Sequence, residues 1–345
     1  MSAAVTPNSG TQLRASVVVP VYYNAGSLAV LCQRLASVAD QLRSYAFEFI
    51  FVDDGSGDQS FEVLRQLYLA DPRIRAVRLS RNYGSNTAIL AGLTYASGDW
   101  VTVIAADLQD PPELIPEMVH AWSDGADVVL AARRSRADPW VTRLTASVFN
   151  RLFRQFVFPD WPRGGCDFML VSRRVALVLA QMAEKNSYIF GQAMWVGFER
   201  HTIFYERTER EHGRSRWTTL RKIKYFIDAF TAFSYLPIRL ASLLGFVFAL
   251  TGFVYAAVII ALRLTNAIQE PGFAALMVVV LIAAGVQLLV LGFIGEYLWR
   301  VLEESRGRPP FIVAHAVNIS IPGQNYWSSP EGVANGRAEE AARRE

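Results

Sequence analysis

Two uncharged apolar stretches in the last third of the chain, Leu240–Leu262 and Gly272–Ile294, restrict the possible folds most strongly. Each is about 23 residues long, close to the roughly 20 residues that an α-helix needs to cross a bilayer. A buried core helix of that length would carry polar residues on one side. A short connection at 263–271 joins the two stretches, so the sequence predicts a hairpin of transmembrane helices at 240–262 and 272–294.

Basic residues flank the predicted hairpin on both sides. Arg221, Lys222, Lys224 and Arg239 precede it, and Arg300, Arg306 and Arg308 follow it. By the positive-inside rule, the residues before the hairpin and the C-terminal tail, 295–345, face the cytoplasm. The segment from Met1 to Gly10 is polar and lacks the apolar core of a signal peptide. We therefore expect a multi-pass protein of the inner (cytoplasmic) membrane, with the lipid bilayer as a partner.

Before the hairpin, short apolar runs alternate with segments of helical periodicity. The runs are Ser16–Pro20, Phe47–Val52, Arg75–Leu79, Val101–Ile104 and Asp127–Ala131. After the first run, apolar residues at 28, 31, 35, 38 and 42 fall on one helix face. Strands that alternate with helices of ten to fifteen residues predict an α/β domain with a mostly parallel, doubly wound sheet. We assign this domain to residues 15–215, after a flexible N-terminus at 1–14.

Polar residues follow four of these runs: Asn24, Asp53 with Asp54, Arg81, and Asp107. Parallel strands end at the same edge of a sheet, where open α/β folds bind ligands. These residues therefore predict a nucleotide-sized site. No Gly-x-Gly-x-x-Gly follows the first run and no Walker-type Gly-Lys-Ser occurs, so phosphate charge must be met by a metal ion or by arginines.

Asp107 and Gln109 follow the fourth run, and Pro111–Pro112 forces a turn before a helix that begins around Glu113. An acid and an amide two residues apart suit a hard cation that holds a diphosphate. The alternative is an Asx-type turn with a solvated carboxylate. These residues alone leave both interpretations open.

Three further segments indicate contact with phosphates, ligands or the membrane surface. Residues 141–158 form a basic amphipathic pattern that favours a helix on the membrane surface, and residues 216–236 predict a second amphipathic helix beside the first span. The basic segment Arg207–Trp217 lies at the expected water–lipid boundary, where arginines meet phosphates. Gly164 and Gly165 before Asp167 permit close approach of the backbone to a ligand, and a plain loop accounts for them equally well.

Overall composition excludes other classes of protein. A net charge of only +3 gives no reason to expect a nucleic acid as a partner. Cys32 and Cys166 lie far apart with no further cysteine, so neither a zinc site nor a disulfide framework is indicated. Gly245, Gly252 and Gly285 in the two spans favour close helix packing, so we expect a homo-oligomer.

Six short motifs in order resemble the family 2 glycosyltransferases. They are Val17-Val-Val-Pro-Val-Tyr-Tyr-Asn24, Val52-Asp-Asp-Gly-Ser56, Leu79-Ser-Arg-Asn-Tyr-Gly84, Ala106-Asp-Leu-Gln-Asp-Pro-Pro-Glu113, Gly165-Cys-Asp-Phe168 and Gly292-Phe-Ile-Gly-Glu-Tyr297. Followed by a two-helix hairpin, the set is similar to the polyprenyl-phosphate glycosyltransferases, which include dolichol-phosphate mannose synthases and bactoprenol glucosyltransferases. The resemblance covers the chain from about Ser16 to Pro310.

The resemblance implies a GT-A fold, a UDP- or GDP-sugar donor, a divalent cation (Mg²⁺ or Mn²⁺), and inverting transfer of the sugar to the phosphate of a polyprenyl lipid. It also implies roles for individual residues. Pro20, Tyr22, Asn24, Asp53, Asp54, Arg81 and Asp107 would bind the nucleotide sugar, Asp107 and Gln109 the metal, and Arg207, Arg210 and Ser215 phosphate, with Asp167 and Asp107 as catalytic residues.

Two residues depart from the family pattern. Ala105 replaces the first acid of the usual Asp-x-Asp, and Ala25 stands where an acid commonly follows Tyr-Asn. Magnesium is often held by one or two carboxylates plus phosphates and water, so we expect a weaker metal site rather than none. The same departures motivate an alternative, a non-catalytic membrane scaffold descended from such an enzyme. A processive polysaccharide synthase is less favoured, because it predicts more spans and a Gln-x-x-Arg-Trp motif, and Gly213 occupies the position of the Gln.

Overall fold

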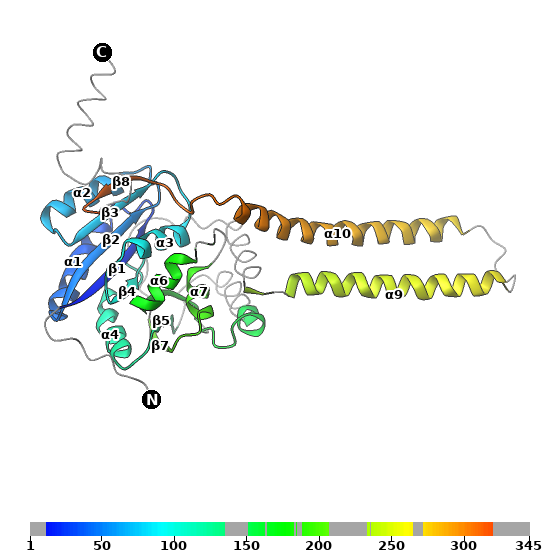
Figure 1. Ribbon diagram of the computed structural model, residues 1–345, viewed down its shortest axis with the longest axis horizontal. Helices are drawn as coiled ribbons and strands as arrows, with labels where there is room; N and C mark the ends of the chain where they lie inside the picture. Colours follow the sequence, from blue (N-terminus) through cyan, green and yellow to red (C-terminus); the bar gives the residue numbers. More distant parts are fainter. Residues whose placement is uncertain are drawn as a thin grey trace, which may run out of the picture. The chain divides into compact units, whose positions relative to one another are not determined.

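The computed structural model describes residues 12–134, 151–162, 164–182, 184, 188–206, 233–234, 236–264 and 272–319 (Figure 1). The chain divides into two compact units, one of residues 1–226 with 309–345 and the other of residues 227–308. Most of the predicted helix at 141–158, nearly all of that at 216–236, and the tail beyond residue 319 lie outside the described residues. Within the first of these segments, residues 151–156 are helical, as predicted.

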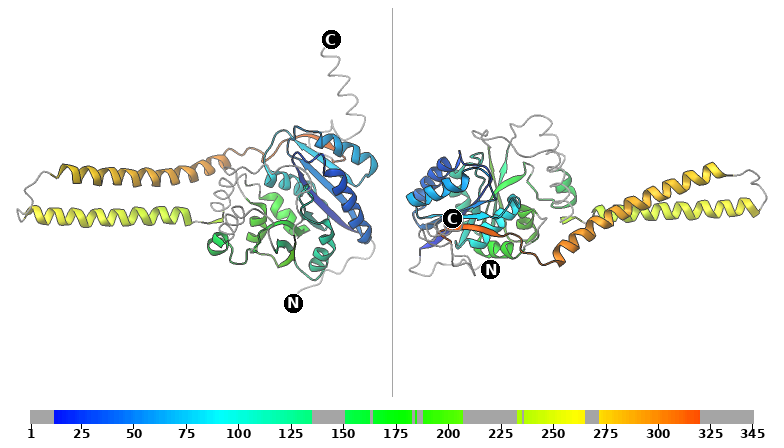
Figure 2. Two further views of the ribbon diagram at one scale, coloured as in Figure 1. Left: turned by 180° about the vertical axis from the view of Figure 1, so that it is seen from behind. Right: turned by 90° about the horizontal axis from the view of Figure 1, so that it is seen from above.

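The first unit is built on one eight-stranded sheet, seen from behind in Figure 2. Its strands are β1 (Leu13–Val21), β2 (Tyr45–Asp53), β3 (Ile74–Leu79), β4 (Trp100–Val103), β5 (Val128–Arg133), β6 (Cys166–Ser172), β7 (Arg200–Tyr205) and β8 (Val313–Val317), in the order β7-β5-β6-β4-β1-β2-β3-β8. β6 is antiparallel to β4 and β5, and β8 is antiparallel to β3. The other strands run in one direction, which confirms the predicted mostly parallel α/β sheet.

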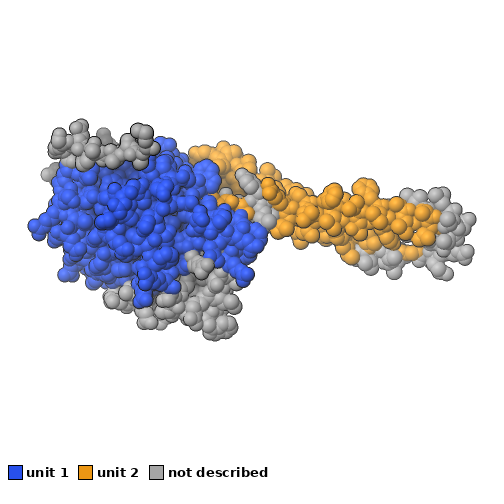
Figure 3. All heavy atoms as spheres, turned by 90° about the horizontal axis from the view of Figure 1, so that it is seen from below, with its two compact units in different colours: residues 1–226, 309–345 blue, residues 227–308 orange. Residues whose placement is uncertain are grey.

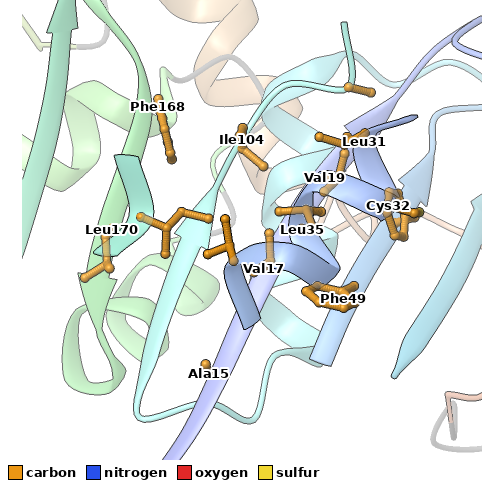
Figure 4. Packing of buried hydrophobic residues seen from close by; sticks show 14 of the residues in the cluster. Ala15, Val17, Val19, Leu31, Cys32, Leu35, Phe49, Ile104, Phe168 and Leu170 are labelled. Carbon is orange, nitrogen blue, oxygen red and sulfur yellow. The ribbon is translucent and has the colours of Figure 1, made fainter. Parts of the chain in front are cut away.

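Helices cover both faces of this sheet. They are α1 (Leu28–Gln41), α2 (Ser60–Ala70), α3 (Ser85–Tyr95), the 3₁₀ turn η1 (Pro112–Leu114), α4 (Ile115–Ser123), α6 (Arg173–Gln181) and α7 (Ile189–Trp195). Figure 4 shows Leu31 and Leu35 of α1 packed toward Val17 and Val19 of β1. Neighbouring residues on a strand point to opposite faces, and Val18 accordingly meets α3. A Cβ at Gly92 of α3 would overlap the Val18 side chain, so glycine permits this close helix–strand packing.

Two elements differ in extent from the sequence-based assignment. β1 begins at Leu13, inside the segment 1–14 that was expected to be a flexible N-terminus. β8 comes from the segment 295–345, which was assigned as a cytoplasmic tail. The run Val-Ala-His-Ala-Val has only five residues and gives little indication of a strand by itself. It is a strand because it pairs with β3, which lies more than two hundred residues earlier in the sequence.

The second unit, orange in Figure 3, contains α9 (Leu236–Leu264) and α10 (Phe273–Ser305), which pack against each other. Both are long and apolar enough to cross a membrane, with windows of mean hydropathy 1.8 over Ile238–Tyr255 and 1.6 over Ile282–Ser305. α9 contains the predicted span at 240–262, and α10 contains all but the first residue of the predicted span at 272–294. α10 continues past Ile294 for three further turns, where Arg300 pairs with Glu296 at 2.9 Å.

Candidate active site

One edge of the sheet collects most of the predicted site residues. The parallel strands β1, β2, β3, β4, β5 and β7 all end there, and the antiparallel strand β6 begins there. This edge therefore carries the loop at 20–24, Asp53 and Asp54, the loop at 80–84, Asp107 with Gln109, and Asp167. Arg207, Arg210 and Ser215, the predicted phosphate-binding residues, lie outside the described residues.

The loop after β1 is shaped by its own polar groups. The backbone N–H of Tyr22 donates to the Asn24 side-chain oxygen at 2.9 Å, and the N–H of Asn24 donates to Ser60 Oγ at 3.0 Å. Tyr23 has a left-handed backbone with φ 58° and donates its N–H to Ser56 Oγ at 3.0 Å. The Asn24 amide oxygen thus holds the turn that presents the Tyr22 and Tyr23 rings, which pack edge-on at 4.7 Å.

Asp53, the last residue of β2, is fully buried. One carboxylate oxygen accepts the N–H of Ser56 at 3.1 Å, and Arg78 Nε lies 3.4 Å from the other oxygen, which has no hydrogen-bond partner among the described residues. Burial raises the pKa of the Asp53 carboxyl, and the contacts with Ser56 and Arg78 oppose the rise. A buried carboxylate oxygen without a donor is costly, so this position is suited to a ligand that supplies one.

Asp54, predicted to bind the donor, supports the loop after β3. Its two carboxylate oxygens accept the backbone N–H groups of Tyr83 at 2.7 Å and Gly84 at 2.9 Å. In the same loop, the Arg81 guanidinium lies 4.3 Å from the centre of the Tyr83 ring. Burial raises the pKa of the Asp54 carboxyl to about 6, although the two hydrogen bonds lower it. Asp54, whose pKa is raised, thus supports the loop that carries Arg81.

Asp54→Asn is expected to flatten the pH dependence of stability between about pH 4 and pH 6. The native protein keeps the Asp54 proton up to a pKa of about 6, whereas the ordinary value is 3.8. The folded state therefore binds more protons in this window. The stabilisation due to Asp54 is complete below the ordinary pKa and is lost as the pH rises through about 6, with a slope of up to about 1.4 kcal/mol per pH unit.

Thermal unfolding in detergent, as the difference in Tm between wild type and Asp54→Asn across pH 3.5 to 7.5, measures this effect. The Tm of Asp54→Asn should rise relative to that of the wild type as the pH increases. Glu117→Gln, which removes an exposed carboxylate of α4, is the matched control and should leave the profile of the wild type unchanged. Parallel profiles for wild type and Asp54→Asn would refute the assignment.

Asp107 lies in the turn that follows β4 and is largely buried. Its Oδ1 accepts the backbone N–H of Gln109 at 3.3 Å, and Leu108 between them has φ 62°. The Asx-type turn expected as an alternative is therefore present. This turn does not exclude metal binding by the same side chain. Ser27 braces the turn from the loop after β1, since its hydroxyl lies 2.6 Å from the carbonyl oxygen of Ala106.

The donor set at this turn fits a cation that is bound mainly through a substrate. Among the described residues, no group of three or more His, Cys, Asp and Glu side chains is placed to hold a metal. Ala105 offers no side-chain donor. The carboxylate of Asp107 and the amide oxygen of Gln109 are hard oxygen ligands, which Mg²⁺ and Mn²⁺ accept, and a diphosphate with water would supply the other ligands.

A second polar cluster joins the ends of β5, β6 and β7. Arg133, the buried last residue of β5, forms an ion pair with Asp167 of β6, whose side chain is 47% exposed. Tyr205 at the end of β7 donates its hydroxyl to the buried carboxylate of Asp110, and burial, followed by Asp110, raises the pKa of this phenol. A Cβ at Gly164 would overlap the Arg133 carbonyl oxygen, so the close backbone approach at this glycine is to β5, whereas the sequence suggested an approach to a ligand.

Asp167 was predicted from the sequence, whereas Arg133, Asp110 and Tyr205 were not among the predicted site residues. The signal that identified Asp53 and Asp107, a polar side chain at the carboxyl end of a parallel strand, also marks Arg133 and Tyr205. Asp110 gives no such signal, because it lies in a turn and its carboxylate is buried only through the folded arrangement.

Comparison with known proteins assigns the family. Residues 16–180 match the profile of glycosyl transferase family 2. The uncharacterized glycosyltransferase YkcC of Bacillus subtilis (strain 168) is 39% identical over 305 residues, 88% of this chain and 94% of YkcC. The chain belongs to glycosyltransferase family 2. It is thus a glycosyltransferase, and the polar strand ends described above are the candidate active site of that enzyme.

Two other family 2 relatives have more specific names. The bactoprenol glucosyl transferase of Shigella phage SfV is 34% identical over 302 residues, 87% of this chain and 98% of that protein. The undecaprenyl-phosphate 4-deoxy-4-formamido-L-arabinose transferase of Edwardsiella ictaluri (strain 93-146) is 35% identical over 312 residues, 89% of this chain and 95% of that protein. Among solved structures, mannosyl-3-phosphoglycerate synthase from Rubrobacter xylanophilus aligns with a TM-score of 0.45 and 18% identity over 76% of this chain and 78% of its own, which is too distant to inform function.

Proposed function

We propose that this family 2 glycosyltransferase moves a sugar from a UDP- or GDP-sugar to the phosphate of a polyprenyl phosphate, with inversion at the anomeric carbon. One observation carries the proposal. Relatives named for bactoprenol and for undecaprenyl phosphate match this chain over 98% and 95% of their own lengths, respectively. Two helices that are long and apolar enough to cross a membrane agree with a lipid acceptor.

The donor is proposed to lie along the edge from β2 to β4. Neighbouring strands are about 4.8 Å apart, so two steps, from β2 through β1 to β4, or about 10 Å, separate the strand end at Asp53 from the strand that leads to Asp107. A nucleoside and its diphosphate span such a distance. The unsatisfied oxygen of Asp53 then accepts a hydrogen bond from the nucleoside, Pro20 and Tyr22 flank the base, and Asp107 with Gln109 faces the diphosphate.

The reaction joins an oxygen of the lipid phosphate to the anomeric carbon and breaks the bond from that carbon to the donor diphosphate. When bound, a divalent cation offsets charge on the departing diphosphate. The lipid phosphate is already anionic and needs little deprotonation. Asp167, paired with Arg133, therefore orients the acceptor and balances local charge, and Arg207, Arg210 and Ser215 bind phosphate.

The proposed enzyme is anchored by α9 and α10 in the inner (cytoplasmic) membrane, with the catalytic unit and the C-terminus in the cytoplasm. The basic residues that flank the two helices support this orientation, because positively charged flanks stay on the cytoplasmic side. Self-association through the glycines of the two helices stays a prediction from the sequence.

A donor and acceptor screen tests the proposal. Purified full-length protein in detergent is incubated with undecaprenyl phosphate, Mn²⁺ or Mg²⁺, and each of a panel of labelled UDP- and GDP-sugars. We expect one donor to give a lipid-linked sugar whose mass equals polyprenyl phosphate plus one glycosyl group, and whose anomeric configuration is opposite to that of the donor. No transfer to undecaprenyl phosphate with any donor would refute it.

A further inference from the structure

The strand β8 lies beside the nucleotide half of the candidate site. It is held across the whole length of β3. At one end the N–H of Ser80 donates to the Ile312 carbonyl oxygen at 2.9 Å, and at the other the side-chain amide of Asn318 donates to the carbonyl oxygens of Pro72 at 2.9 Å and Ile74 at 3.3 Å. The residue directly opposite Arg78 in this ladder is His315. Directly opposed residues share one face of a sheet and lie close enough for their side chains to interact.

Arg78 links this strand to Asp53. Its guanidinium donates to the carbonyl oxygen of Ser56 at 2.9 Å, lies 3.4 Å from the buried Asp53 carboxylate, and is 5.7 Å from the centre of the Phe61 ring. The ring of His315 packs on the same Phe61, with 6.0 Å between ring centres. Phe61 thus lies against both side chains, and His315 occupies the position opposite Arg78.

The local backbone strengthens this link. The ladder between β3 and β8 shifts register between Arg78 and Leu79, with Ala314 as the extra residue on β8. Such bulges re-aim side chains and are common beside binding sites. Burial, followed by Arg78 and Arg65, lowers the pKa of His315, so its imidazole is neutral at pH 7 and adds no charge beside the guanidinium.

We infer that β8 is a working part of the donor site, in which His315 and Phe61 hold Arg78 in place and Arg78 orients the buried Asp53 carboxylate toward the nucleoside. Arg78 and His315 are positioning residues, since they act through Asp53. The inference rests on the proposed function, in which Asp53 accepts a hydrogen bond from the donor nucleoside. It gives the segment after α10 a role in substrate binding, beyond closing the edge of the sheet.

Calorimetric titration of the full-length protein in detergent with UDP and with GDP, each with Mn²⁺, tests the inference. Arg78→Met should weaken binding of the preferred nucleotide at least about tenfold, because a buried carboxylate that loses its cation favours the neutral form. Arg78→Lys should restore part of the affinity, since lysine returns the charge without the planar geometry of the guanidinium. In Arg78→Met the midpoint of the pH dependence of binding should move upward relative to wild type.

His315→Ala and Asn318→Ala separate positioning from simple stability. Both remove side-chain contacts of the β8 segment, but only His315 lies beside Arg78. We expect His315→Ala to weaken nucleotide binding by about threefold or more while Asn318→Ala leaves it unchanged, even where both lower Tm.

Three outcomes decide the inference. Equal loss of affinity in His315→Ala and Asn318→Ala would reduce β8 to a structural element and overturn the inference. Unchanged affinity and pH profile in folded Arg78→Met would overturn it while the proposed function stands. Absence of UDP and GDP binding by the wild-type protein would instead overturn the proposed function, and this inference with it.

Discussion

Asp107→Asn is expected to lower sugar transfer to polyprenyl phosphate by about a hundredfold or more, and Asp107→Ala by a similar factor. Comparing the two variants separates the role of Asp107 in the turn from the role of its negative charge. An asparagine keeps a side-chain oxygen that accepts the N–H of Gln109, so it preserves the Asx-type turn found in the structure. It removes only the negative charge, which the proposed cation on the donor diphosphate requires.

The missing first acid makes this effect large. With Ala105 in place of a carboxylate, no second acidic side chain precedes Asp107 on the strand end to hold the ion if Asp107 is lost. We therefore also expect residual activity of Asp107→Asn to need a much higher concentration of Mn²⁺, measured as the metal concentration at half-maximal rate.

Asp124→Asn is the matched control for Asp107→Asn. Asp124 follows α4, is 68% exposed and pairs only with the neighbouring His120 at 2.9 Å among the ion pairs of the described residues. This variant should keep the activity and the metal dependence of the wild type. If Asp107→Asn stayed active while Asp107→Ala did not, the residue would serve the turn alone and the metal assignment would be wrong.

Sequence patterns predicted most of the fold because the spacing of apolar residues and the ends of strands can be recognised within a short stretch of sequence. Leu28, Leu31, Leu35 and Val38 recur on one helix face, and all four are buried in α1. Strand order is not local. β6 lies antiparallel between β4 and β5. β8 pairs with β3, although the two apolar helices separate them in the sequence. Neither position is visible in a run of apolar residues, because both depend on partners distant in the sequence.

The same limit separates the site residues that could be predicted from those that could not. Asp53 and Asp107 could be predicted as site residues because Asp53 ends β2 and Asp107 lies in the turn that follows β4. Asp54 was predicted to bind the donor, and the structure shows its carboxylate accepting two N–H groups from a loop about thirty residues later. The pair of Arg133 and Asp167 exists only because β5 and β6 are antiparallel neighbours, so its two members end and begin at the same edge.

Sugar transfer is also expected to depend on the ion pair between Arg133 and Asp167. Asp167→Asn and Arg133→Gln should each lower kcat about a hundredfold, while the affinity for the nucleoside diphosphate changes little. The reason for this split is distance. Four strand steps separate β5 from β2, or about 19 Å, so the pair lies far from Asp53 and the proposed nucleoside site.

The double variant with both substitutions distinguishes a functional pair from two independent sites. Residues that act as a unit are strongly non-additive. The double variant should therefore lose little more activity than the worse single variant, whereas independent roles would multiply to a loss of about ten-thousandfold.

Arg133 also shares its buried surroundings with Tyr205, so Arg133→Gln should lower Tm more than Asp167→Asn, whose carboxylate is half exposed. Tyr205→Phe, which leaves both members of the ion pair in place, is the control: it should lower Tm and retain most of kcat. A multiplicative loss in the double variant would show that Asp167 acts without Arg133, and the role of the pair in orienting the acceptor would have to be abandoned.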